Sequence, residues 1–122
     1  MRKILVVEDE DILRETYELI LSMEPYIIDT ARNGQEALEA CKTKRYDLIL
    51  LDIMMPVMDG VSFLEHIQTL DIGDPKIILL TNLSTGTELE HALRLGAQTN
   101  ILKSSISPKQ LLTTVRYEVE AV

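Results

Sequence analysis

The sequence predicts an α/β fold, a doubly wound parallel sheet of five strands with helices on both faces. Short apolar segments rich in valine, isoleucine and leucine alternate five times with longer segments of helical period. The apolar segments show little polar alternation, which is typical of strands buried on both faces of a sheet. Strands that alternate with helices in this way run parallel and are joined by right-handed crossovers, so the helices cover both sides.

The first two strand and helix units are expected in the amino-terminal 44 residues. A strand at residues 3–7 precedes a helix from residue 9 or 10 to residue 23, and Pro25 ends that helix. A weaker strand follows at residues 26–30. Asn33 is a good N-cap for a second helix that extends to about residue 44. The inward faces of the two helices are expected to contain Leu13, Tyr17, Ile20, Leu21, Ala37, Leu38 and Cys41.

The remaining three units follow the same order. Strands are expected at residues 47–51, 76–80 and 99–102, and helices at residues 61–70, at about residues 88–95 and after residue 107. Gly96 fits the C-terminal cap of the fourth helix. Ser107, Pro108 and Gln110 form a capping box with proline at the first helical position. The inward residues are expected to be Leu64, Ile67, Leu89, Ala92, Leu93, Leu111, Leu112, Val115 and Val119.

Length and composition predict one domain, residues 1–122, with an ordinary globular core. There are 20 acidic residues against 12 lysines and arginines, for a net charge of -8, which disfavours direct binding of nucleic acid or an anionic membrane. The single cysteine, Cys41, excludes an internal disulfide and is expected to be a packed core thiol in the reducing cytoplasm. No signal peptide is visible, and no apolar segment approaches the roughly 20 residues of a membrane span.

Four of the five strands are followed by, or end in, a chemically capable side chain. These residues are Glu8 and Asp9, Asp52, Thr81, and Lys103. The carboxyl ends of parallel strands share one edge of the sheet, where ligands bind in open α/β folds. Three carboxylates at one edge favour Mg²⁺, a hard cation that prefers oxygen ligands. The set predicts a phosphoryl site with a carboxylate nucleophile, a metal ion and lysine to neutralise charge, and a hydroxyl donor.

The whole chain resembles a receiver domain of bacterial two-component response regulators. The matching segments are VVEDE at residues 6–10, LDIMMPVMDG at residues 51–60, LT at residues 80–81 and LK at residues 102–103. They match the blocks of that family in order and spacing. In the second block Pro56 fixes φ and Asp59-Gly60 is a turn signal, so a rigid loop follows Asp52.

The resemblance implies that Asp52 accepts a phosphoryl group from a histidine kinase or a phosphotransfer protein. It implies that Mg²⁺ is held by Asp9, Asp52, the Met54 backbone carbonyl and, through water, Glu8, while Thr81 and Lys103 bind phosphoryl oxygens. It further implies the strand order 2-1-3-4-5 and a cytoplasmic signalling domain, not an enzyme, that catalyses only its own phosphorylation and dephosphorylation. Output, and a homodimer where one forms, would use the face of the fourth helix, fifth strand and fifth helix.

Three positions depart from the family pattern. Asn100 stands where the family usually has tyrosine or phenylalanine, Asn82 where it has a small residue, and Ser104 where it has proline after a cis bond. A cis bond before a residue other than proline costs about 2.5–4 kcal/mol. We therefore expect a trans bond between Lys103 and Ser104 and a changed path of the loop that carries the lysine.

Two alternatives remain open. One is an interaction module that resembles a receiver but works without phosphate, which Asn100 favours and the intact acidic site opposes. The other is a phosphatase of the haloacid dehalogenase type, which needs a second aspartate two residues after the nucleophile, where this chain has Met54. A regulator that acts by itself is preferred over a fragment of a longer one.

Overall fold

The structure is a computed structural model that describes residues 1–83 and 85–120, and it has the predicted architecture. The five strands are β1 (Lys3–Val7), β2 (Ile27–Ala31), β3 (Leu48–Leu51), β4 (Lys76–Thr81) and β5 (Thr99–Leu102). The five helices are α1 (Asp11–Leu21), α2 (Gly34–Thr43), α3 (Gly60–Ile67), α4 (Thr87–Arg94) and α5 (Pro108–Glu120). Within these described ranges, no helix is long and apolar enough to cross a membrane.

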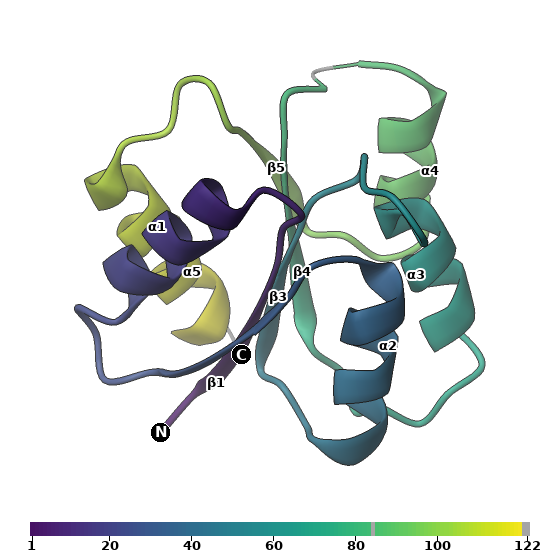
Figure 1. Cartoon of the computed structure of the whole chain (residues 1–122), viewed down its shortest axis with the longest axis horizontal. Helices are drawn as coiled ribbons and strands as arrows, with labels where there is room; N and C mark the ends of the chain where they lie inside the picture. The colour runs from purple at the N-terminus through teal and green to yellow at the C-terminus, as the bar shows by residue number, and fades with distance from the viewer. Residues whose placement is uncertain (84, 121–122) are drawn as a thin grey trace.

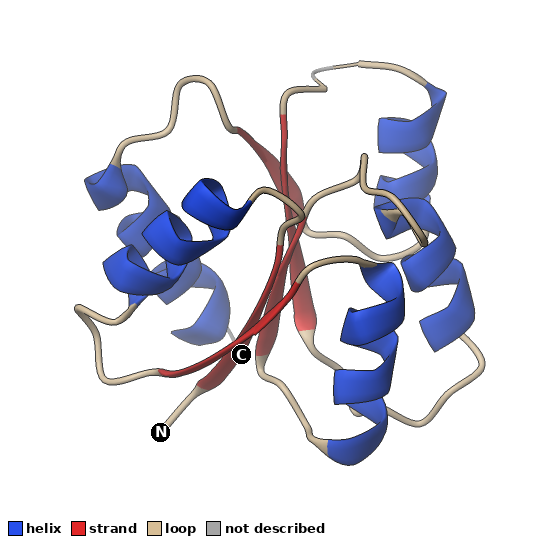
Figure 2. Cartoon of the chain, viewed as in Figure 1, coloured by secondary structure: helices blue, strands red, loops and turns tan. Residues whose placement is uncertain are grey.

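The strands form one parallel sheet in the order β2-β1-β3-β4-β5, which confirms the expected fold class and strand order. Figure 1 shows the sheet as a central layer with α1 and α5 on one face and α2, α3 and α4 on the other. All strands point the same way, so the loops that leave their carboxyl ends gather at one edge of the sheet (Figure 2). The amino-terminal end lies near the opposite edge.

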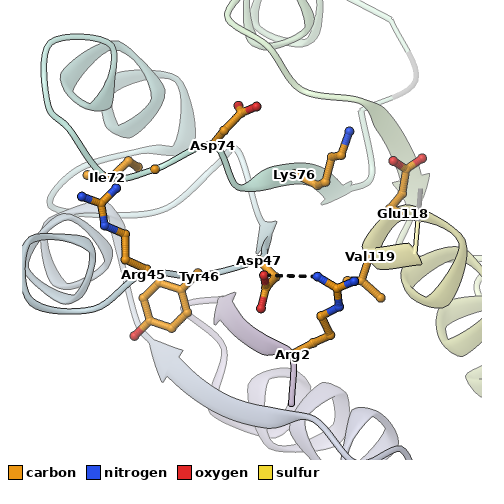
Figure 3. Close-up of a pocket in the computed structure, with 10 residues that line it drawn as sticks. Arg2, Arg45, Tyr46, Asp47, Ile72, Asp74, Lys76, Glu118 and Val119 are labelled. Atoms are coloured by element: carbon orange, nitrogen blue, oxygen red, sulfur yellow. Dashed lines mark ion pairs between the residues drawn. The ribbon is translucent and has the colours of Figure 1, made fainter. Parts of the chain in front are cut away.

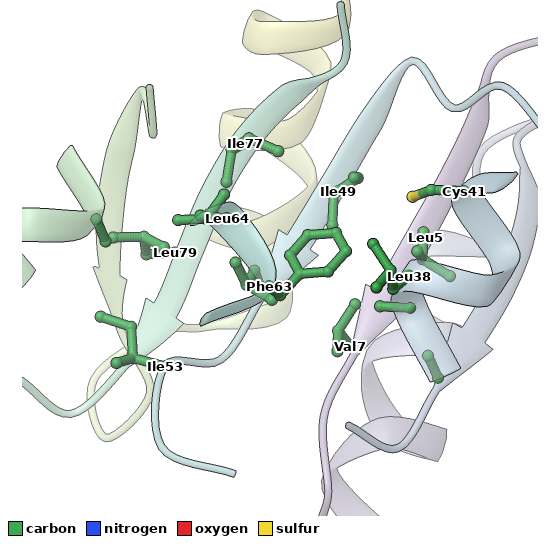
Figure 4. Close-up of a cluster of buried hydrophobic side chains, with 14 of the residues drawn as sticks. Leu5, Val7, Leu38, Cys41, Ile49, Ile53, Phe63, Leu64, Ile77 and Leu79 are labelled. Carbon is green, nitrogen blue, oxygen red and sulfur yellow. The ribbon is translucent and has the colours of Figure 1, made fainter. Parts of the chain in front are cut away.

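The core is divided by the sheet into two apolar layers, because successive strand residues point to opposite faces. In β1, Leu5 and Val7 pack on the side of α2 and α3, whereas Ile4 and Val6 pack on the side of α1 and α5. β3 and β4 alternate in the same way. Figure 4 shows the first layer, where the ring of Phe63 lies among side chains from the strands and from α2. Cys41 is buried in this layer, as expected for a core thiol.

The predicted helix caps are present. Asn33 Oδ1 accepts the Glu36 backbone N–H at 2.9 Å. Ser107 and Gln110 exchange two bonds, with Ser107 Oγ accepting from Gln110 N at 3.1 Å and Gln110 Oε1 accepting from Ser107 N at 2.8 Å. Gly96 has a φ of 114° after α4, the left-handed conformation that favours glycine at a helix end. These caps fix where α2, α4 and α5 begin or end.

Other boundaries differ from the prediction by one to three residues. α1 ends at Leu21 instead of residue 23, and α3 ends at Ile67 instead of residue 70. In both cases the next residues continue as turns whose N–H groups bond three residues back, as Met23 N does to Ile20 O. The prediction for Leu93 was wrong, since its side chain is 41% exposed. α4 has only eight residues, and Leu89 and Ala92 already cover the contact with the sheet.

Candidate functional site

The backbone ladder of the sheet continues for one residue beyond three strand ends and thereby positions the candidate side chains. Glu8 N donates to Ala31 O at 3.0 Å, and Asp52 N donates to Val7 O at 3.1 Å. Lys103 N donates to Thr81 O at 3.2 Å. The side chains at these ends therefore start from backbone positions that the sheet fixes, at the edge that the sequence predicted.

Three carboxylates from β1 and β3 lie together at this edge. One carboxylate oxygen each from Glu8, Asp9 and Asp52 lies within 4.8 Å of the others. Lys103 follows β5, the strand next to β4. Its Nζ atom lies 2.8 Å from Asp52 Oδ2 and 2.6 Å from Glu8 Oε1. The ammonium group therefore pairs with both buried carboxylates at close range.

Burial shields the charged groups of this cluster from water. The exposed fractions of Glu8 and Asp52 are 1% and 4%. Burial raises the pKa of Asp52, and its hydrogen bond to Lys103 offsets only part of that rise. Burial also raises the pKa of Glu8, with a further contribution from the neighbouring Asp52 charge. Burial alone would lower the pKa of Lys103, but its contacts with Asp52 and Glu8 outweigh burial and raise it, so the side chain stays an ammonium group.

The donor set fits a hard divalent cation. Carboxylate oxygens from Glu8, Asp9 and Asp52 converge, and oxygen ligands of this kind suit Mg²⁺. The Lys103 ammonium group, 2.6 Å from Glu8 Oε1, supplies one positive charge against the three carboxylates, which leaves net negative charge for a metal ion to neutralise. The side chains present therefore fit the metal ion that the sequence predicted.

The end of the loop after β3 packs closely against the backbone of Asp52 and Ile53. Gly60 N donates to Ile53 O at 2.8 Å, and a Cβ atom on Gly60 would lie only 2.4 Å from Asp52 O. Asp59 caps α3 by accepting the Ser62 N–H at 2.8 Å. The glycine is required here because no side chain fits between the start of α3 and the backbone of the candidate nucleophile.

The candidate residues surround an open pocket of about 250 Å³. Its lining includes five of the six predicted site residues, which are Asp9, Asp52, Met54, Thr81 and Lys103. The sixth, Glu8, is buried beside them. The Met54 side chain is 60% exposed, and it offers no acid where a haloacid dehalogenase needs one. The pocket therefore has room beside Asp52 for a small anionic group.

Sequence reasoning missed two contacts that join the loops above the pocket. Asn82 Oδ1 accepts the Ser104 backbone N–H at 3.0 Å, and Asn100 Nδ2 donates to Leu83 O at 2.8 Å. Both asparagines had been identified as departures from the family, but local patterns give no sign of partners 22 and 17 residues away. Among the described residues no peptide bond is cis, so the Lys103–Ser104 bond is trans, as expected.

A larger pocket of about 340 Å³ lies at the opposite edge of the sheet, where the strands begin (Figure 3). Its charged side chains come in both signs, and Arg2 pairs with Asp47 at 3.5 Å. Arg45 pairs outside the pocket with Asp71 at 3.2 Å. With its charges balanced and no convergent set of ligands, this pocket is not the candidate site.

The chain is similar in sequence to known signalling proteins. A family model described as a response regulator receiver domain matches residues 4–116. The chemotaxis protein CheY of Halobacterium salinarum is 34% identical over 107 residues, which are 88% of each chain. The transcriptional regulatory protein LnrK of Bacillus subtilis is 39% identical over 105 residues, covering 84% of this chain but 47% of LnrK.

The comparison with solved structures agrees in the fold. A CheY-like response regulator receiver domain protein from Methanospirillum hungatei superposes with a TM-score of 0.90 at 27% identity, covering 98% of this chain and 94% of that one. Several of the curated relatives are transcriptional regulators, and the chain spans about half of their length.

Proposed function

Because the chain belongs to the family of response regulator receiver domains, we propose that it is a phosphorylation-driven signalling domain, residues 1–122, whose phosphoacceptor is Asp52. The phosphodonor is a histidine kinase or a phosphotransfer protein. Receiver domains are signalling domains and are not generally classed as enzymes, so the proposed chemistry is limited to the chain's own phosphorylation and dephosphorylation. The observation that carries the proposal is the buried Asp52 carboxylate, paired with Lys103 at 2.8 Å beside an open pocket.

In the proposed reaction an Asp52 carboxylate oxygen attacks the donor phosphorus. The new oxygen–phosphorus bond forms as the bond from phosphorus to the donor nitrogen breaks, which leaves an acyl phosphate and releases the donor imidazole. Lys103 neutralises charge on the phosphoryl oxygens, because its raised pKa keeps it cationic. Thr81 Oγ1 accepts the Leu83 N–H at 3.4 Å, so the hydroxyl proton is left to donate to a phosphoryl oxygen.

Mg²⁺, which neutralises negative charge in such reactions, would be held by Asp9, Asp52 and the Met54 backbone carbonyl, with Glu8 acting through water. The three side chains repel one another without a cation, so binding should stabilise the fold by mass action. At 100 times the dissociation constant the gain is about 2.7 kcal/mol. We expect thermal melts to shift upward with Mg²⁺, and Asp9→Asn to remove most of the shift. An unchanged shift in Asp9→Asn would place the metal elsewhere.

The direct test of the acceptor is intact-mass measurement after incubation with acetyl phosphate and Mg²⁺. The wild type should gain the mass of one phosphoryl group, and Asp52→Asn should gain none. Asp74→Asn is the matched control, because Asp74 is an exposed aspartate in the pocket at the opposite edge. Labelling that persists in Asp52→Asn would refute the assignment. A wild type that stays unlabelled would favour the alternative of an interaction module that works without phosphate.

A protein partner is supported by exposed apolar side chains on α1, the helix that starts at the edge of the sheet with the candidate site. Ile12, Leu19 and Met23 lie along one side of α1 and the turn after it, with exposed fractions of 79%, 69% and 70%. Their spacing of seven and four residues places them on one face. An apolar surface on a helix that starts at the candidate site suits docking of the phosphodonor protein.

Output is proposed to run through α4, β5 and α5, where a homodimer would also form. Thr81 leads directly into the loop before α4, which includes Ser84, a residue outside those described. Amide exchange before and after addition of beryllofluoride, a phosphoryl analogue, should change most at residues 82–95. A change confined to α1 would contradict this route. The Tyr117 side chain is 71% exposed on α5. A dimer that uses this face should therefore dissociate in Tyr117→Ala, and sedimentation velocity measures the change in association.

A further inference from the structure

Two asparagine side chains connect the loop that follows Thr81 with the loop that follows Lys103. Asn100, on β5, donates to Leu83 O at 2.8 Å and so ties the β4–α4 loop to the sheet. Asn82, in the tied loop, accepts the Ser104 N–H at 3.0 Å. The contacts run from β5 to one loop and from that loop to the next.

The position of the second contact gives it a specific consequence. Lys103 N donates to Thr81 O at 3.2 Å, the last backbone bond between the two strands at this edge. The next backbone donor along the chain is Ser104 N, and the Asn82 side chain supplies its acceptor. Asn82 therefore adds one further rung to the ladder immediately after the lysine. The backbone on both sides of Lys103 is held, by Thr81 O before its side chain and by Asn82 Oδ1 after it.

Lys103 needs such support because a lysine side chain is a flexible stem with four rotatable bonds. Its Nζ atom has to serve two buried carboxylates, at 2.6 Å and 2.8 Å, and its aim depends on the backbone from which the stem starts. Holding that backbone reduces the conformational entropy lost when the ammonium group contacts an incoming phosphoryl group. Ser104 has no ring to restrict the backbone, so a hydrogen bond is the restraint that the chain offers here.

We propose that Asn82 is a positioning residue for Lys103 in phosphoryl transfer, acting through the Ser104 backbone N–H and itself held in place by the bond from Asn100 to Leu83. This inference rests on the proposed function of Asp52 as phosphoacceptor. Asn82 also lines the pocket beside Asp52, and the role assigned to it here acts through the loop that follows Lys103.

The first test is Asn82→Ala, which removes the acceptor from an exposed position and should leave the fold intact. Amide exchange at Ser104 should speed up, because its N–H loses its partner. The rate of phosphorylation by acetyl phosphate should fall about fivefold, the effect of losing one hydrogen bond of ordinary strength. The affinity for Mg²⁺ should change less than twofold, since the carboxylates are untouched. Ser104→Ala keeps the N–H and should behave as the wild type, and Asn82→Asp keeps Oδ1 and should restore slow exchange at Ser104.

A double-mutant cycle separates this route from a direct effect on the pocket. Ser104→Pro removes the donor, so adding Asn82→Ala to it should cause no further loss of rate. If Asn82→Ala lowers the rate equally in the wild type and in Ser104→Pro, the positioning role is overturned. Unchanged amide exchange at Ser104 in Asn82→Ala alone would also overturn it, and this measurement does not depend on the proline variant. A wild type that takes no phosphoryl group would overturn the proposed function itself. A labelled wild type matched by an equally fast Asn82→Ala would overturn the positioning role alone.

Discussion

Replacing Val57 with glycine is expected to stabilise the chain, although it deletes an apolar side chain. Val57 has a φ of 69°, and among the described residues it is the one with a positive φ that is not glycine. Met58 N donates to Pro56 O at 2.8 Å, so Val57 is the central residue of a γ-turn. A β-branched side chain is a poor fit in this conformation, which glycine adopts without a steric cost.

The expected gain follows from two opposing effects. The left-handed region costs a residue with a Cβ atom about 1–2 kcal/mol. Glycine loses more backbone freedom on folding, and this loss opposes the stabilisation by roughly 0.5–1 kcal/mol. Packing adds little, because the Val57 side chain is 82% exposed. The free energy of unfolding should therefore rise by about 0.5–1 kcal/mol, or about 2–5 °C in melting temperature for a domain of this size.

Urea unfolding followed by circular dichroism measures this change. Val57→Ala is the matched control, because it removes the exposed methyl groups but keeps the Cβ atom that causes the strain. It should recover less than half of the glycine gain. Equal stabilisation by alanine and glycine, or a loss in Val57→Gly, would show that the γ-turn is not strained and would refute the reasoning.

Three further outcomes are expected from unfolding measurements. Gly60→Ala should destabilise by about 1–3 kcal/mol despite the better helix propensity of alanine, because its Cβ would lie 2.4 Å from Asp52 O; an unchanged midpoint would contradict this. Tyr46→Phe should cost about 1 kcal/mol at pH 7, since the Tyr46 hydroxyl donates to Asp29 at 2.7 Å. That hydrogen bond lowers the pKa of Asp29, so the stability it contributes is lost as pH falls through the lowered pKa, and the variant should approach the wild type in acid. Burial raises the pKa of Asp52, so without Mg²⁺ its contribution is present in acid and is lost as pH rises through that pKa; Asp52→Asn should gain on the wild type as pH rises above about 4, and parallel curves would contradict it.

The sequence predicted most of the architecture because each buried strand is a short, continuous apolar segment that can be recognised from the sequence alone. β5 was predicted at its observed bounds, and the caps at Asn33 and Ser107 follow from side-chain chemistry within three residues. Helix ends were less well predicted. α1 and α3 each end two or three residues early, because the last apolar residues of the pattern lie in turns that no local signal separates from the helix.

The composition of the candidate site was predictable for a similar reason. Parallel strands bring their carboxyl ends to one edge, so Glu8, Asp52 and Lys103 converge once the strand ends are known. The three-dimensional contacts between loops were not predictable. The bond from Ser104 to Asn82 spans 22 residues, and the approach of Gly60 to the Asp52 backbone depends on the path of the whole loop between them.

The three departures from the family bear on Lys103 through the loops and leave the backbone position of Asp52 to the sheet. Asp52 and Lys103 start from backbone atoms that bond to neighbouring strands, at 3.1 Å and 3.2 Å, and these bonds involve no side chain. Substitution in a loop cannot easily move Asp52, because β3 is buried and paired on both sides, whereas Lys103 follows the edge strand β5, which pairs with β4 alone. Asn82 and Ser104, by contrast, meet beyond the last strand bond, and the Asn100 side chain reaches from β5 to the backbone of the loop that carries Asn82. Sequence change at these positions can therefore alter how the two loops are coupled while the acidic edge keeps its geometry.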